Sequence, residues 1–132
     1  MSVQANAKFQ MKSWDEKPYD EIEGGPKLAR ATVAKSYSGD IEGDGTVEYL
    51  MIHREDGSAS FVGLERVIGS IGDRRGSFVL EHKGTFEGGI AKDTWSIVPG
   101  SGTGDLSGLR GEGGFASAHA EEYAITLDYD FE

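Results

Sequence analysis

The chain has 132 residues, of which 37% are hydrophobic and 27% charged, and this balance is typical of one globular domain, residues 1–132. The formal net charge of −10 would repel nucleic acid, and no apolar run reaches the roughly 20 residues that a membrane-spanning helix needs. The absence of cysteine excludes disulfides, thiolate metal sites and a cysteine nucleophile. The first residues lack the basic and apolar segments of a secretion signal, so we expect a cytoplasmic protein.

Glycines separate short stretches in which apolar and polar residues alternate, a pattern typical of strands joined by tight turns. In chain order, this alternation predicts strands over residues 3–14, 27–37, 46–54, 58–69, 77–86, 90–98, 115–120 and 122–131. We expect residues 15–19 to end the first strand, residues 39–45 to form a compact turn, and residues 99–114 to form a long glycine-rich loop. Residues 117–123 are the best candidate for a helix, because no apolar stripe at helical spacing exceeds two turns.

About eight strands with hairpin turns predict an antiparallel meander, which is either a barrel or a sandwich. Strands of ten or more residues would leave long unpaired edges in an open sheet, and closure removes those edges. We therefore predict an all-β fold, a closed antiparallel barrel of eight strands.

One histidine is expected in the barrel interior. His82 shares its face of the strand with Phe78 and Leu80, so alternation directs all three side chains inward. A neutral imidazole in an apolar lumen can act as an acid or base, or hydrogen-bond a ligand. The alternative is a structural histidine held by a neighbouring carboxylate.

The strand over residues 58–69 is apolar on both faces, which predicts cover on both sides. Glu65 alternates with Phe61 and Val67, and the opposite face carries further apolar residues. We expect one face to line the barrel and the other to meet a partner subunit or a flanking segment. A Glu65–His82 pair across the lumen is the best acid/base candidate, and a purely structural ion pair is the alternative.

Large flat aromatic side chains suit an apolar ligand at a barrel mouth. Together with the interior residues above they form the predicted ligand-binding set: Trp14, Tyr49, Glu65, Phe78, His82 and Trp95. The histidines lie in three separate segments and can meet only across the barrel, so we predict neither a metal site nor a cofactor.

The most distinctive segment is Val-Pro-Gly-Ser-Gly-Thr-Gly-Asp-Leu-Ser-Gly-Leu-Arg-Gly-Glu-Gly at residues 98–113. It resembles the glycine-rich segment of dirigent proteins and plant allene oxide cyclases. Residues 75–82 and 93–97 are similar to these proteins in order and spacing, so the likeness covers roughly the C-terminal half. A phosphate-binding loop is not indicated, because Asp105 and Leu106 stand where such a loop carries lysine and Ser or Thr.

A bacterial family of unknown function resembles nearly the whole chain. Its opening is similar to Ser-Trp-Asp-Glu-Lys-Pro-Tyr at residues 13–19, and its centre to Phe-Val-Gly-Leu-Glu-Arg at residues 61–66. The resemblance implies an eight-stranded barrel like that of allene oxide cyclase, and a tendency to self-associate as a dimer or trimer. It carries no cyclase mechanism, because the catalytic positions of the cyclases find no matching motif in this chain.

These observations leave three hypotheses for function. The first is a barrel that binds a small apolar or amphipathic ligand in its lumen, since eight strands enclose just enough room for one. The second is an isomerase or cyclase acting on such a ligand, with Glu65 and His82 as acid and base. The third is a barrel filled by side chains that acts only as a homo-oligomeric interaction module. An empty lumen of a few hundred Å³ separates the first two from the third.

Overall fold

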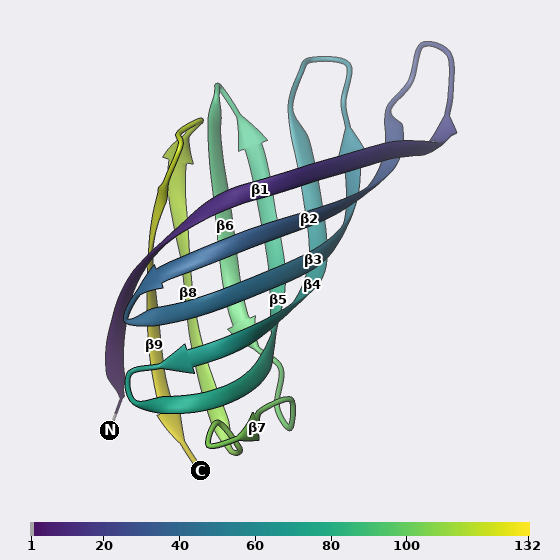
Figure 1. Ribbon diagram of the computed structural model, residues 1–132. Coiled ribbons are helices and arrows are strands. Elements are labelled where there is room, and N and C mark those ends of the chain that lie inside the picture. The colour runs from purple at the N-terminus through teal and green to yellow at the C-terminus, as the bar shows by residue number, and fades with distance from the viewer. Residues whose placement is uncertain (1) are drawn as a thin grey trace.

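The computed structural model describes residues 2–132, and the chain forms a closed antiparallel β-barrel (Figure 1). The strands are β1 (Val3–Glu21), β2 (Lys27–Gly39), β3 (Ile41–His53), β4 (Ala59–Ile71), β5 (Arg74–Glu87), β6 (Ile90–Ile97), β7 (Thr103–Gly104), β8 (Leu109–Ala118) and β9 (Tyr123–Phe131). Eight of them pair in the order β1-β2-β3-β4-β5-β6-β8-β9, and β9 pairs with β1 to close the ring. The short β7 pairs with the first part of β5, which β6 does not reach. Residues 2–132 contain no helix long and apolar enough to cross a membrane.

The predicted closed barrel of eight strands is confirmed, but several predicted boundaries are wrong. β3 begins at Ile41, so most of the expected turn over residues 39–45 is strand. Residues 117–123 are not a helix but end β8 and form its hairpin to β9. β8 begins at Leu109, inside the expected loop, and a Cβ atom at its Gly111 or Gly113 would overlap the backbone of β9. Glycine there marks a close approach of two strands rather than a loop.

The first strand is longer than predicted, because residues 15–19 do not end it. Beyond Phe9, which pairs with Tyr123, β1 pairs with β2 alone among residues 2–132, and an edge of this kind tolerates Pro18. Two β-bulges interrupt the β1–β2 pairing, with Lys12 and Tyr19 as the extra residues. Each bulge reverses which side chains of β1 point inward.

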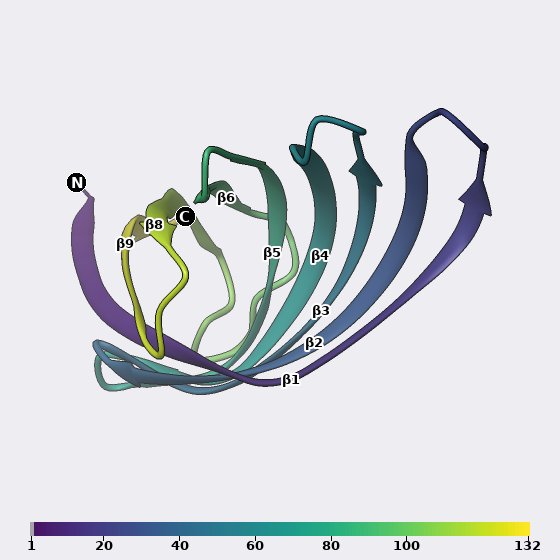
Figure 2. The same ribbon diagram turned by 90° about the horizontal axis from the view of Figure 1, so that it is seen from above.

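The barrel interior has one filled end and one open end. The filled end lies by the β2–β3 and β4–β5 turns, where aliphatic side chains are almost fully buried. These side chains are Ile41, Ile71, Leu80, Leu106, Leu109 and Leu127. At the other end β1 continues beyond its pairing with β9, so that β1 and β2 splay away from β8 and β9, as the view from above shows (Figure 2). Room for a ligand inside the barrel therefore lies toward the splayed end.

Candidate functional site

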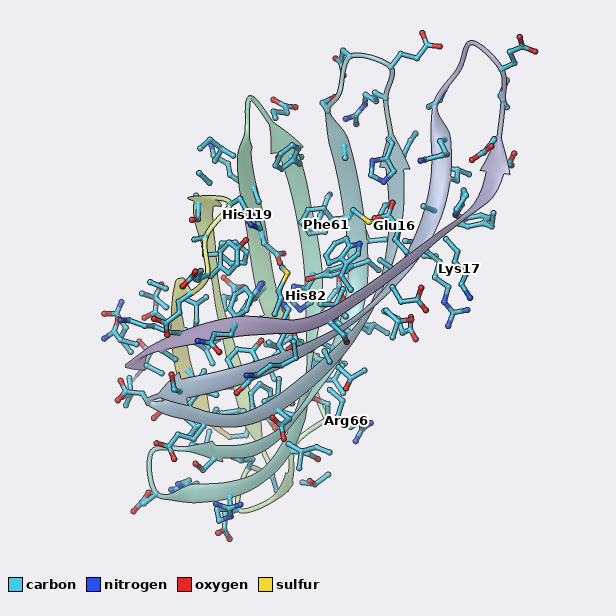
Figure 3. All side chains as sticks on the ribbon, turned by 45° about the horizontal axis from the view of Figure 1, so that its top comes forward. Glu16, Lys17, Phe61, Arg66, His82 and His119 are labelled. Carbon is cyan, nitrogen blue, oxygen red and sulfur yellow. The ribbon has the colours of Figure 1, made fainter. Side chains whose placement is uncertain are left out.

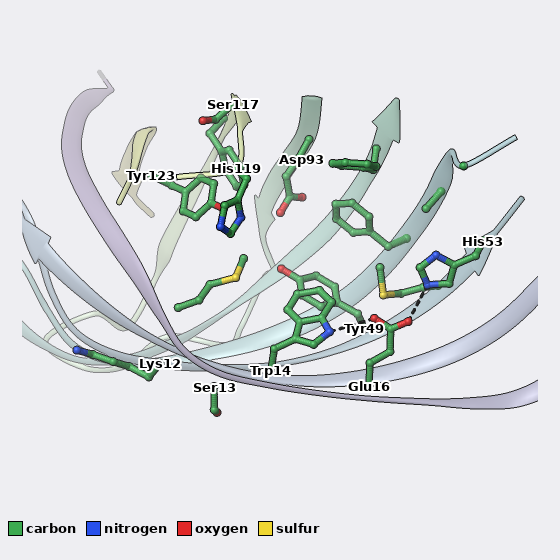
Figure 4. Close-up of a pocket in the computed structure, with 18 residues that line it drawn as sticks. Lys12, Ser13, Trp14, Glu16, Tyr49, His53, Asp93, Ser117, His119 and Tyr123 are labelled. Carbon is green, nitrogen blue, oxygen red and sulfur yellow. Dashed lines mark hydrogen bonds and ion pairs between the residues drawn. The ribbon is translucent and has the colours of Figure 1, made fainter. Parts of the chain in front are cut away.

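A cavity of about 690 Å³ opens at the splayed end of the barrel (Figure 4). Most of its wall is apolar and comes from Met11, Trp14, Tyr49, Met51, Ala59, Phe61, Phe86, Ala91, Phe115 and Tyr123. Its polar groups come from Lys12, Ser13, Glu16, His53, Asp93, Ser117 and His119. A concave, mainly aromatic wall with a few polar groups, of this volume, is typical of small-molecule sites.

The bulge at Lys12 builds one wall of the cavity. Upstream of it Met11 pairs with the inward-facing Lys35, and downstream Trp14 pairs with the inward-facing Val33. Even-numbered side chains of β1 therefore point inward after the bulge, which brings Trp14 and Glu16 to the cavity.

Hydrogen bonds fix the position of this wall. Trp14 Nε1 donates to Glu16 Oε1 at 3.0 Å, and the other oxygen of Glu16 lies 2.7 Å from His53 Nε2. The Trp14 and Tyr49 rings are 6.1 Å apart between centroids. The aromatic wall is thus held by contacts between β1 and β3.

Four charged side chains form a buried cluster beneath the cavity, made of Lys35, Glu65, His82 and Asp93. Their residues are 1%, 0%, 0% and 4% exposed, respectively. Glu65 Oε1 accepts a hydrogen bond from Lys35 Nζ at 3.2 Å and lies 2.7 Å from His82 Nε2. The other ring nitrogen, His82 Nδ1, lies 2.7 Å from Asp93 Oδ2. The cluster thus links strands β2, β4, β5 and β6 through the interior.

The charges of this cluster balance when His82 is protonated. An ionised carboxylate only accepts hydrogen bonds, so a histidine between Glu65 and Asp93 satisfies both by donating from both nitrogens. Burial lowers the pKa of His82, but the hydrogen bonds to Asp93 and Glu65 outweigh it and raise that pKa above its ordinary value. Two cations, Lys35 and His82, then face two carboxylates.

Burial also acts on Glu65, and its partners again outweigh it. Burial raises the pKa of Glu65, whereas the charge of Lys35 and the hydrogen bond from His82 lower it below its ordinary value overall. The ammonium of Lys35 gains further support from the Phe9 ring, whose centroid lies 4.5 Å from Nζ. A buried charge needs partners of this kind to remain ionised.

Two tyrosines complete the hydrogen bonding of the cluster. The Tyr37 hydroxyl donates to Glu65 Oε2 at 2.6 Å, and Lys35 Nζ donates to the Tyr49 hydroxyl at 3.2 Å. Burial and the nearby carboxylates raise the pKa of both tyrosines well above the ordinary value. Both phenols therefore stay protonated at neutral pH.

Inward-facing glycines leave space for these side chains. A Cβ atom at Gly45 would overlap Glu65 Oε2, and one at Gly84 would overlap the Phe61 ring. Each glycine lies on a strand next to that of the residue it accommodates. The glycines of β3 and β5 thus shape the cluster and the cavity wall.

Asp93 belongs to both the buried cluster and the cavity. Its Oδ2 atom is held by His82, whereas the buried Oδ1 atom has no hydrogen-bond partner within residues 2–132. The close-up shows the carboxylate directed into the cavity (Figure 4). Glu65 and His82 are not part of the cavity wall, so Asp93 is the carboxylate through which the cluster reaches it.

The predicted ligand-binding residues fall into three groups. Trp14 and Tyr49 line the cavity. Glu65 and His82 form the predicted contact in the interior, where Figure 3 shows His82, but they lie behind the cavity wall. Phe78 and Trp95 are buried in the core and do not line the cavity. Any catalytic or binding role of these residues stays a prediction.

Sequence reasoning missed several residues of this site. Lys35 lies on the same face of β2 as Val33 and Tyr37, and Asp93 precedes Trp95 by two positions on β6, so alternation could have placed both inward. Glu16 had no such signal, because its direction depends on the bulge. Among residues 2–132, no group of three or more His, Cys, Asp or Glu is arranged to hold a metal ion.

Comparison with known proteins identifies the family. The sequence model described as "Protein of unknown function (DUF3224)" matches residues 5–129. The chain belongs to the DUF3224 family. A crystal structure of a DUF3224 protein of unknown function from Shewanella oneidensis MR-1 is 29% identical, with a TM-score of 0.81, and the match covers 100% of this chain and 99% of that one. No curated protein matches the chain.

The predicted membership of a family of unknown function is therefore confirmed. The finer likeness to allene oxide cyclases and dirigent proteins stays a prediction.

Proposed function

We propose that this DUF3224 protein binds one small apolar or amphipathic molecule in the cavity at the splayed end of the barrel. The observation that carries the proposal is the cavity itself, about 690 Å³ in volume and walled mainly by aromatic and methionine side chains. Ligand pockets have volumes of roughly 300–1,000 Å³ and bury most of a small molecule. A barrel filled by side chains at both ends would have no such space.

Ligand binding is better supported than a catalytic role for Glu65 and His82, the two residues that the sequence suggested as acid and base. Every carboxylate oxygen of Glu65 and both ring nitrogens of His82 already have protein partners. Neither residue lines the cavity, so neither is in reach of a molecule bound there without rearrangement. An isomerase or cyclase reaction with Glu65 and His82 as acid and base remains the less supported alternative.

Titration with the neutral fluorophore N-phenyl-1-naphthylamine tests the proposal, since its emission rises in an apolar environment. We expect saturable binding of one molecule per chain. Ala91→Trp should weaken it at least tenfold, because Ala91 lines the cavity and an indole there would occupy it. Ala116→Trp is the matched control, since Ala116 is exposed and pairs with Lys92, the neighbour of Ala91. Equal binding by the two variants would contradict the proposal.

A second candidate function, homo-oligomerisation, is favoured by an apolar patch on the outer face of β3 and β4. Its residues are Leu50, Val62, Leu64 and Ile68, which are 51%, 48%, 56% and 62% exposed. Patches of this kind mark interaction sites. If the patch joins copies as a dimer or trimer, the Leu64→Lys variant should have a lower mass by light scattering, and Ala91→Trp should not. A wild-type monomer would overturn this proposal and leave ligand binding intact.

We place both functions in the cytoplasm, as the sequence predicts.

A further inference from the structure

We propose that Asp93 is the ligand anchor, and that the ligand is an aromatic or alkyl molecule ending in a hydrogen-bond donor, with a protonated amine preferred over a carboxylate. This inference rests on the proposed function and names the class of molecule that the cavity takes.

Asp93 carries an unpartnered acceptor. The residue is 4% exposed, and Oδ1 has no partner within residues 2–132, although every other side-chain nitrogen and oxygen of the buried cluster has at least one. A buried acceptor without a donor is unfavourable, and a donor on a ligand removes that penalty. The carboxylate points into the cavity, so a donor placed there reaches it (Figure 4).

His82 fixes the orientation of the Asp93 carboxylate. Its Nδ1 atom holds Asp93 Oδ2 at 2.7 Å, while Nε2 is fixed by Glu65. This leaves Oδ1 as the free oxygen and fixes its direction. His82 is therefore a positioning residue for Asp93 and does not touch the ligand.

The charge around the cavity favours a cation. A second carboxylate, that of Glu16, lies in the wall, and the chain has a formal net charge of −10. Aromatic side chains such as Trp14, Tyr49 and Phe61 attract a cation. An anionic ligand at Asp93 would instead meet a carboxylate oxygen that has no donor.

The cationic side chains of the wall do not reverse this preference. His53 is already paired with Glu16 at 2.7 Å. Lys12 and His119 also line the cavity, and Lys12 lies on the far side of it from Asp93 (Figure 4). Asp93 is the residue of the buried cluster that lines the cavity, so a cationic group placed there meets a carboxylate.

Three indole compounds of similar size separate the possibilities. Tryptamine carries a protonated amine at neutral pH, tryptophol a neutral hydroxyl and indole-3-acetate a carboxylate. We expect tryptamine to bind most tightly to the wild-type protein, tryptophol next, and indole-3-acetate at least tenfold more weakly than tryptamine. Calorimetry or NMR titration measures the order. Equal affinities, or a preference for indole-3-acetate, would overturn the inference.

Asp93→Asn tests the anchor directly. The amide oxygen can accept the bond from His82 Nδ1, which leaves the NH₂ group facing the cavity as a donor. We expect tryptamine to lose at least tenfold in affinity and indole-3-acetate to gain. Asp44→Asn is the matched control, since Asp44 is exposed and does not line the cavity, and it should keep the wild-type order. An unchanged order in Asp93→Asn would overturn the inference.

A measurement on the wild-type protein covers the case in which Asp93→Asn does not fold. The ¹³Cγ resonance of Asp93 should move on titration with tryptamine, and shifts confined to other side chains would contradict the anchor. If none of the three indoles binds and N-phenyl-1-naphthylamine also fails, the proposed function is wrong. If N-phenyl-1-naphthylamine binds but the three indoles bind with equal affinity or not at all, only the role of Asp93 as the anchor is wrong.

Discussion

His82 Nε2 lies 2.7 Å from Glu65 Oε1 in the interior of the barrel, where neither side chain is exposed to solvent. Glu65 contacts Lys35 as well, and His82 contacts Asp93, so the pair is the centre of a chain of four charges. This chain ends at the cavity wall, at Asp93. The stability of the barrel and the chemistry of the cavity thus depend on the same residues.

Replacing Lys35 should destabilise the protein far more than replacing a surface cation on the same strand. Lys35→Met leaves Glu65 without its ammonium partner, and breaking a buried ion pair costs about 3 kcal/mol or more. Arg30→Met removes an exposed pair with Glu48, whose side chains are 63% and 46% exposed, and should cost less than about 1 kcal/mol. Urea unfolding measures both free energies. Similar losses for the two variants would show that the cluster is not held together by charge.

The stability of the fold should decline on both sides of a pH window. Because its folded-state pKa is raised above 6.5, His82 contributes stability that is complete below 6.5 and is lost as pH rises through that pKa. Because its folded-state pKa is lowered below 4.5, Glu65 contributes stability that is present above 4.5 and is lost as pH falls through that pKa. Where His82 loses its proton, the free energy of unfolding should fall by at most about 1.4 kcal/mol per pH unit, because a single proton is released.

Two histidine variants test whether His82 causes the loss of stability at alkaline pH. His82→Gln should abolish the decline between neutral and alkaline pH, measured as the free energy of unfolding in urea. His119→Gln is the control, since His119 is exposed, and it should retain the wild-type profile. A wild-type profile in His82→Gln would assign the decline to another group.

Gly45 should tolerate no side chain. Gly45→Ala places a methyl group on Glu65 Oε2, so the carboxylate must move away from its partners. We expect a loss of about 1–3 kcal/mol, as for overpacking elsewhere in protein cores, and a weaker alkaline decline in stability. Gly25→Ala in the β1–β2 hairpin is the control, since its Cβ would meet only Ile22, at 3.3 Å or more. Equal stability of the two variants would contradict the close contact at Gly45.

The aromatic wall positioned by the bulge at Lys12 should be needed for binding. Trp14→Asp places a carboxylate in this wall, so N-phenyl-1-naphthylamine should bind at least tenfold more weakly. Tyr19→Asp changes an exposed aromatic residue of the same strand that does not line the cavity, and should leave binding unchanged. Retained binding in Trp14→Asp would show that this wall is dispensable.

Much of the fold follows from alternation and from the avoidance of free strand edges. The inward direction of Glu65 and His82 could be predicted because both continue an unbroken alternating strand. The bulge at Lys12 could not, because it depends on how β1 pairs with β2 and has no local signature. The inward direction of Trp14 and Glu16 depends on this pairing.

Burial of charge was the other limit of sequence reasoning. Lysine is almost never fully buried unless it is paired, so Lys35 gives no sign of its position until Glu65 is placed beside it. Gly45 has two meanings in sequence, a turn or room for a neighbouring side chain, and only the register of β3 against β4 decides between them. The site is thus defined by contacts between strands more than by any one segment.

The central claim is that the cavity at the splayed end holds a small apolar molecule, and an NMR titration of ¹⁵N-labelled protein with tryptophol tests it most directly. We predict saturable shifts of backbone amides around the cavity, including Asp93, Phe115 and Tyr123, with none around Ile41 and Leu109 at the filled end. Saturable shifts centred on the filled end or on the outer face, or no shifts with either millimolar tryptophol or N-phenyl-1-naphthylamine, would contradict the account.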